Sequence, residues 1–345
     1  MNQVLQHNPY VPYVEKFENS SEFSYLAEAF KRNKYYTSIP SSTYEYKLFW
    51  DDVMEKCIHG FTNSKGIKIT GKHFFYLNFV QILAKDEETG RKDKLFPRFL
   101  DIDYAYFHML DYCKQTKNGK HLILVKGRRL GFSYKCAAVL AHEFNFFRNS
   151  KSVIGTFLGK LGETTMGFTL DNLNFINENT PYKKARNPDT KDFVKARFEK
   201  NVDGVRFWAG YNSEVKAITF KDNAYASVGL SANWLMFDEA GVFDNIINAF
   251  NMSEPLLMDG NDVVGNAVLF GSAGSVESNS NGFSKMFYNP RAYNMLEFRH
   301  PEKPEVTMGW FVSAAWGRLG KFKNREMVDE DGNSNIELAT ENILH

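Results

Sequence analysis

The chain has 345 residues, of which 43% are hydrophobic and 24% charged, with 24 glycines and 10 prolines. This composition is typical of a soluble globular protein of about two domains, and it excludes disordered, collagen-like and disulfide-scaffold proteins. The 42 basic and 41 acidic residues nearly cancel, so the chain has no global positive field, and any contact with nucleic acid needs a local patch.

The three cysteines, Cys57, Cys113 and Cys136, lie far apart and form no C-x-x-C pair. This pattern disfavours a zinc site and a disulfide framework, and it favours a reducing compartment. The N-terminal segment lacks the basic-then-apolar pattern of a signal peptide, and no stretch reaches the roughly 18 apolar residues of a membrane span. We therefore expect a cytoplasmic protein without a membrane partner.

The first 110 residues predict a mainly helical lead-in that is rich in tyrosine and phenylalanine. Helical patterns cover residues 25–30 and 45–57. Residues 66–71 alternate between two glycines and predict a short hairpin strand. Residues 73–83 fit either a strand or a helix, because their periodicity favours neither.

From residue 121 onward, short apolar runs alternate with helical stretches, which is typical of a parallel sheet covered by helices on both faces. Residues 206–209 and 217–220 alternate like the antiparallel strands of an added hairpin. The last 25 residues are polar and predict a linker without a clear element. The predicted sheet strands are residues 122–125, 152–156, 234–237, 267–270 and 310–314.

The first apolar run leads into a glycine-containing loop, Lys126-Gly127-Arg128-Arg129-Leu130-Gly131-Phe132-Ser133, and then into a helical stretch that begins at Tyr134. Strand, glycine loop and helix form a phosphate cradle, in which backbone N–H groups face the phosphates and a Ser or Thr hydroxyl binds Mg²⁺. We therefore predict that residues 126 to 134 bind ATP and that Ser133 binds Mg²⁺. The alternative is a plain turn that joins a strand to a helix.

This loop departs from the usual pattern G-x-x-x-x-G-K-[ST]. Gly131 and Ser133 are in register, but Phe132 takes the position of the lysine and Lys126 that of the first glycine. A phosphate loop needs a cation, so either Lys126 or Arg129 must reach the phosphates, and we favour Lys126.

Two further apolar runs end in polar residues that suit phosphate chemistry. Asp238 and Glu239 follow residues 234–237, where Asp238 would hold Mg²⁺ and Glu239 would activate the water that attacks the γ-phosphate. Ser272 follows residues 267–270 and would hydrogen-bond the γ-phosphate or that water. Because parallel strands present their ends at one edge, all three segments are expected to converge. The alternatives are a helix-capping acidic pair and a glycine-serine turn.

The three segments together resemble the ATPase domain of the large terminase subunit of tailed bacteriophages. The likeness lies in the displaced cation and G-x-S of Lys126 to Ser133, in Asp238-Glu239-Ala240-Gly241 and in Gly271-Ser272-Ala273. The segment from Gly66 to Phe79 also resembles the region upstream of the ATPase in a subset of these proteins. The resemblance implies an α/β P-loop NTPase of RecA/ASCE-like type, with a mainly parallel sheet flanked by helices, a mostly helical lead-in and a small C-terminal lid or linker.

The same resemblance implies an ATP-driven motor that moves double-stranded DNA into a procapsid in the host cytoplasm. Its expected partners are the portal protein, a small terminase subunit and further copies of the chain in a ring, usually a pentamer. We expect the lead-in at residues 1–110, the ATPase core at 111–290 and a lid with linker at 291–345. The family's nuclease domain is expected to be absent, and with it DNA cleavage.

The resemblance also implies an adenine contact and an arginine finger. Gln81 is a candidate for the adenine contact, although it also suits an exposed helix position. Arg128 and Arg129 would act within the loop, with Arg129 as the predicted catalytic arginine. Arginines that would act across a subunit interface are Arg206, Arg291 and Arg318.

For DNA, the basic segment at residues 183–200 is the candidate contact. It carries seven basic and three acidic residues, which gives a net charge of 7 − 3 = +4. Lysine and arginine contacts to phosphates suit a motor that must pass over every base sequence, whereas a solvated helix face explains the charges equally well.

Two other functions fit the same motifs. A helicase-like ATPase shares the loop and the acidic pair, but it needs a second domain of ~150 residues for which too little sequence follows residue 275. A nucleotide-binding structural component without turnover has no need for Glu239 as a base.

Overall fold

The computed structural model describes residues 8–85, 90–115, 119–128, 130–221, 223–272, 281–300 and 303–345. The chain folds into two compact units. Unit 1 consists of Met1–Met109, Asp171–Lys183 and Ala315–His345, and unit 2 of Leu110–Leu170 and Lys184–Ala314. The division at residues 110 and 290 that we predicted from the sequence stays a prediction.

Unit 2 contains a seven-stranded sheet in the order β15-β5-β12-β9-β6-β8-β7. Every neighbouring pair is parallel except β7 with β8, which is antiparallel. The strands are β5 (Leu122–Lys126), β6 (Lys151–Thr156), β7 (Phe193–Val202), β8 (Val205–Thr219), β9 (Trp234–Asp238), β12 (Asn266–Ser272) and β15 (Trp310–Val312). The mainly parallel sheet confirms the predicted α/β class and the five predicted sheet strands.

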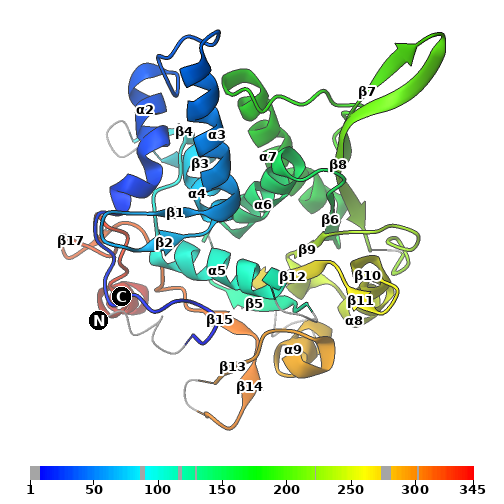
Figure 1. Ribbon diagram of the computed structural model, residues 1–345. Helices are drawn as coiled ribbons and strands as arrows, with labels where there is room; N and C mark the ends of the chain where they lie inside the picture. The colour runs from blue at the N-terminus through cyan, green and yellow to red at the C-terminus, as the bar shows by residue number, and fades with distance from the viewer. Residues whose placement is uncertain are drawn as a thin grey trace. The chain divides into compact units, whose positions relative to one another are not determined.

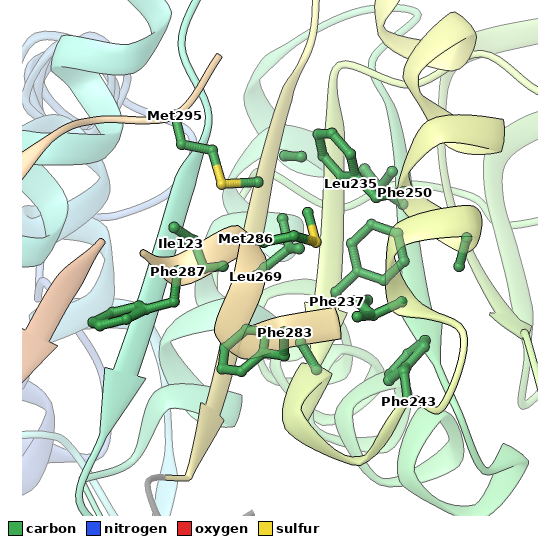
Figure 2. Packing of buried hydrophobic residues seen from close by; sticks show 14 of the residues in the cluster. Ile123, Leu235, Phe237, Phe243, Phe250, Leu269, Phe283, Met286, Phe287 and Met295 are labelled. Atoms are coloured by element: carbon green, nitrogen blue, oxygen red, sulfur yellow. The ribbon is translucent and has the colours of Figure 1, made fainter. Parts of the chain in front are cut away.

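Side chains alternate between the two faces of this sheet. On one face Ile123, Leu235 and Leu269 pack against Phe250 and Phe283 from helices α8 (Ile246–Ser253) and α9 (Asn281–Phe287) (Figure 2). On the other face, helix α6 (Phe132–Phe146) contributes the ring of Phe132, which packs 6.1 Å from the ring of Phe270. Helices therefore cover both faces, as predicted, and the strands β5, β6, β9 and β12 are buried between them. Unit 2 also contains the first part of α7 (Gly159–Asn179) and two hairpins, β10 (Met258–Asp259) with β11 (Asp262–Val263) and β13 (Phe298–Arg299) with β14 (Thr307–Met308).

The predicted hairpin of residues 206–209 with 217–220 is wrong in its pairing. Residues 206–209 and 217–219 lie in the single strand β8, whose antiparallel partner is β7. A register shift between Lys195 and Arg197 divides this ribbon, and beyond it residues 198–208 are exposed (Figure 1). The two alternating segments therefore belong to one strand with a partly buried half and an exposed half.

Unit 1 is mainly helical, with an aromatic core that includes Phe17, Phe23, Phe74 and Phe99. The buried Asn78 side chain links backbone groups within this core. Its amide N–H groups donate to the carbonyls of Phe23 and Phe74, and its oxygen accepts from two backbone N–H groups. The helices are α2 (Tyr25–Asn33), α3 (Tyr44–His59), α4 (Gly71–Phe79), most of α5 (Asp101–Gln115), the end of α7 (Gly159–Asn179) and α10 (Ile336–Leu344). The paired strands are β1 (Phe61–Thr62), β2 (Lys68–Ile69), β3 (Ile82–Lys85), β4 (Lys92–Leu95), β16 (Lys321–Phe322) and β17 (Arg325–Glu326).

Capping side chains determine the structure of two segments in unit 1. The ambiguous residues 73–83 are mostly helix, because the Thr70 hydroxyl caps α4 by accepting from the N–H of His73. The C-terminal segment is not a featureless linker, since α10 begins after Asn335, whose side chain caps it, and buries Leu338 and Ala339. That prediction was wrong because Ile336, Ala339 and Ile343 repeat at helical spacing within the polar segment.

Candidate functional site

The carboxyl ends of β5, β9 and β12 meet at one edge of the sheet. Lys126 pairs directly with Ser272 in the register of β5 with β12, and Asp238 ends β9 on the other side of β12. The parallel register therefore brings together three segments that are far apart in sequence, as the predicted convergence requires.

Two glycines shape the loop between β5 and α6. A Cβ atom at Gly127 would lie 2.8 Å from Cα of Ala314, so only glycine fits there. Gly131 has a φ of 70°, in the left-handed region, and immediately precedes α6. The first N–H groups of a helix have no partner within the helix, so those of Phe132, Ser133 and Tyr134 form a place where an anion can bind.

The side chain at the usual lysine position belongs to the core. Phe132 is 2% exposed, and its ring packs near those of Phe270 and Trp310. Lys126 lies at the edge itself, with its Nζ 2.9 Å from Oε1 of Glu239 and 3.5 Å from Oγ of Ser272. The Ser272 hydroxyl also donates to Oε2 of Glu239 at 3.2 Å, which closes a three-residue network.

Glu239 has a left-handed backbone, with φ 50° and ψ 47°, which is uncommon for a residue other than glycine. Such a conformation costs about 1–3 kcal/mol and is concentrated at functional sites. It turns the chain sharply from β9 into the short 3₁₀ helix η2 (Ala240–Val242). The carboxylate, still 28% exposed, thereby reaches Lys126 and Ser272 rather than following the strand.

Asp238 lies deeper, at 3% exposure, and receives two hydroxyl groups. Ser133 Oγ lies 3.1 Å from Oδ2 and 3.4 Å from Oδ1, and Thr165 Oγ1 from helix α7 donates to Oδ2. Burial raises the pKa of Asp238 above its usual range, while the hydrogen bonds from Thr165 and Ser133 oppose that shift. Thr165 is a residue that our sequence analysis missed.

The donors around Ser133 and Asp238 fit Mg²⁺. This ion prefers oxygen ligands and is usually bound by one or two carboxylates together with substrate phosphates, rather than by a cage of protein side chains. A carboxylate and a hydroxyl 3.1 Å apart meet that requirement. The described part of the chain has no cluster of three or more His, Cys, Asp or Glu side chains that could hold a metal ion.

The remaining loop residues have other surroundings. Arg128 is exposed, and the predicted catalytic Arg129 lies outside the described residues. The carbonyl oxygen of Leu130 accepts a hydrogen bond from Lys135 Nζ at 2.5 Å. The Tyr134 ring stacks on Phe168 at 4.1 Å, so its backbone N–H, rather than its ring, faces the loop side of the helix.

The other candidates from the sequence have surroundings of their own. Arg206 is exposed on the β7–β8 ribbon with Glu199 3.5 Å away, and Arg291 is exposed near α9. Arg318 belongs to unit 1, where it donates to Asn342. Gln81, also in unit 1, lies between α4 and β3 rather than in a helix, and its N–H donates to Asn172.

In the basic segment at residues 183–200, carboxylates hold three of the seven cations. Two of the others stack on aromatic rings, Lys184 on Tyr211 at 4.3 Å and Arg197 on Trp208 at 4.1 Å. The ion pairs are Arg186 with Asp189, Lys191 with Glu163 and Lys195 with Glu214, at 3.0, 2.6 and 2.8 Å. The exposed positive charge is therefore smaller than the composition of the segment indicates.

No helix within the described ranges is long and apolar enough to span a membrane. No protein-family model and no curated protein matches the chain. Solved structures do match it. The ATPase domain of the Thermus phage P74-26 large terminase is 15% identical over 59% of this chain and 79% of that one, with a TM-score of 0.43.

Two longer proteins also match. The HK97 bacteriophage large terminase is 16% identical, with 58% of this chain and 36% of that one covered and a TM-score of 0.38. The large terminase of a thermophilic bacteriophage, solved with ADP, is 13% identical, with 52% and 40% covered and a TM-score of 0.32. The matched region thus spans well under half of these two longer chains, and in all three structures the similarity is one of distant fold.

Proposed function

We propose that the chain is the ATP-hydrolysing motor portion of a viral large terminase subunit. The observation that carries this proposal is the edge of the sheet where Lys126, Glu239 and Ser272 form one network and Ser133 and Asp238 another, beside the N-terminus of α6. A cation, a carboxylate open to water and a hydroxyl–carboxylate pair are the groups that phosphoryl transfer to water requires.

Each residue has its own task in this proposal. The Lys126 ammonium neutralises the terminal phosphates, while the N–H groups at the start of α6 hold their oxygens. The Glu239 carboxylate takes a proton from the attacking water, and Ser272 orients that carboxylate. Mg²⁺, when bound, neutralises charge on the phosphate oxygens, and Ser133 and Asp238 would hold it.

The proposed role in DNA packaging rests on the resemblance of the sequence motifs to those of phage large terminase subunits. By this resemblance, ATP hydrolysis drives double-stranded DNA into a procapsid in the host cytoplasm. The proposed partners are the portal protein, a small terminase subunit and further copies of the chain in a ring, pentameric as is usual for the family. An arginine from Arg128, Arg129 or a neighbouring copy would complete the site.

The test is ATP binding and hydrolysis by the purified chain, with and without double-stranded DNA, beside Glu239→Gln and Lys126→Ala. We expect Glu239→Gln to bind ATP with turnover reduced about 100-fold or more, because the base is lost while the cradle remains. Lys126→Ala should lose most ATP affinity, because the phosphates lose their cation.

Lys31→Ala is a suitable control, since Lys31 is exposed on α2, pairs with Glu28 at the surface and has no part in the proposed site. If both site variants bind and hydrolyse ATP like the wild type, the assignment of this site is wrong. If the wild type binds ATP without hydrolysis even with DNA, the chain is a nucleotide-binding component and the motor proposal fails for the isolated protein.

A further inference from the structure

Thr165 joins the candidate site from an element that carries none of the sequence motifs. It lies in α7, is fully buried, and donates its hydroxyl hydrogen to Oδ2 of Asp238. Ser133 Oγ lies nearest the same oxygen, at 3.1 Å. Oδ2 thus receives both hydroxyls, whereas among the described residues Oδ1 has no partner closer than Ser133 Oγ at 3.4 Å.

The sheet register explains how α7 reaches this carboxylate. Thr156, the last residue of β6, pairs with Asp238 in the parallel register of β6 with β9, and α7 begins three residues later at Gly159. A Cβ atom at Gly162 would lie 3.0 Å from the Thr156 hydroxyl, so glycine allows the helix to approach closely. Thr165 follows three residues later, on the same face of the helix.

The hydrogen-bond acceptor of the Thr165 hydroxyl differs from the usual acceptor of a threonine inside a helix. A threonine inside a helix commonly donates to the carbonyl three or four residues earlier. Thr169, one turn further along α7, does this by donating to the Thr165 carbonyl at 2.9 Å. Thr165 instead donates to a carboxylate in another element, so its hydroxyl restrains Asp238 rather than its own helix.

We propose that Thr165 is a positioning residue for magnesium in the proposed ATPase site. By occupying Oδ2, its hydroxyl fixes the orientation of the Asp238 carboxylate and leaves Oδ1 and the Ser133 oxygen for the ion or its bound water. Residues that orient metal ligands in this way typically contribute about 10- to 100-fold in metal affinity. This inference rests on the proposed function.

The experiment is calorimetric titration of the chain with ADP, in EDTA and in Mg²⁺, for the wild type, Thr165→Val, Thr165→Ser and Thr169→Val. Valine keeps the shape of threonine and removes the hydroxyl. Thr169→Val is the matched control, because it makes the same change at a buried position of the same helix, where the hydroxyl bonds only the helix backbone.

We expect all four proteins to bind ADP equally in EDTA. In Mg²⁺, Thr165→Val should need about 10- to 100-fold more of the ion to reach the wild-type affinity, while Thr165→Ser and Thr169→Val follow the wild type. The same shift should appear in the Mg²⁺ dependence of ATP hydrolysis. If Thr165→Val does not fold, Thr165→Ala provides the same comparison.

Three outcomes would overturn the inference. If ADP binding by Thr165→Val depends on Mg²⁺ as in the wild type, Thr165 does not position the ion, and the proposed function is unaffected. An equal loss in Thr169→Val, or a loss of ADP binding in EDTA, assigns Thr165 to the packing of α7 only. A wild-type protein that binds no nucleotide in either buffer overturns the proposed function, and this inference with it.

Discussion

Two residues of the proposed phosphate loop depart from the usual pattern, and their surroundings explain the departure. Phe132 stands where a lysine usually follows the glycine, but it faces the core against Phe270 and Trp310. Lys126 stands where the first glycine usually is, at the end of β5, with its ammonium beside Glu239. Phe132 therefore packs the helix against the sheet, and Lys126 is placed to supply the positive charge of the proposed site.

Restoring the usual lysine should consequently harm the protein. Phe132→Lys places an ammonium in an aromatic core and removes a ring, which should cost about 3 kcal/mol or more of unfolding free energy. It should not recover ATP binding when it is combined with Lys126→Ala. Urea unfolding and ATP titration check both statements, with Phe132→Leu as the apolar control. A double variant that regains ATP affinity would show that position 132 can face the phosphates.

At the scale of elements, His121 ties the start of β5 to the start of β12. Its ring is 1% exposed, and Nδ1 accepts the backbone N–H of Ala267 at 3.1 Å. Burial is the main reason that the pKa of His121 falls from 6.5 to about 4. The neutral ring is thus part of the strand pairing that carries Lys126 and Ser272.

This histidine should make the free energy of unfolding depend on pH. Between about pH 4 and pH 6.5 the unfolded chain binds a proton at His121 that the folded chain does not, so stability rises with pH across this window. Below pH 4, protonation of His121 in the unfolded chain should lower the free energy of unfolding by about 3 kcal/mol relative to neutral pH. In His121→Asn the side-chain oxygen can accept the same N–H without titrating, so denaturant unfolding at several pH values should give a flatter profile. An unchanged slope in this variant would contradict the assignment.

The strands β5, β6, β9 and β12 could be predicted because each is a short apolar run that is almost wholly buried. Residues 234–237 and 267–270 illustrate this, since every residue of β9 is buried. The strand β8 was misread because its pattern changes along its length: one half is half-buried beside β6, and the other forms an exposed ribbon. Thr165 could not have been predicted, because its role depends on the register that sets Thr156 beside Asp238.

For the whole molecule, the charge balance leaves DNA affinity to local patches. The seven cations of residues 183–200 include three that carboxylates already hold, so at most four remain for phosphates. Each neutralised phosphate contributes about −0.9 to the slope of log affinity against log salt concentration.

Binding of double-stranded DNA through this segment should therefore have a slope of about −4 or shallower. Fluorescence anisotropy of a labelled duplex at several salt concentrations measures it. Lys200→Ala should reduce the slope by about 1 without changing any preference among sequences, whereas Lys16→Ala, in unit 1, is the control. A slope of about −6 or steeper, or no change in Lys200→Ala, would place the DNA contact elsewhere.

The ribbon of β7 and β8 ends in a two-residue turn at Asp203 and Gly204, both with positive φ, which suits a tight hairpin. Around this turn both faces of the ribbon meet solvent (Figure 1). A chain inserted between these two residues would disturb no core contact, because tips of this kind tolerate added sequence. A dye or a tether placed there would make the motion of this part of unit 2 visible in single molecules while the phosphate loop stays intact.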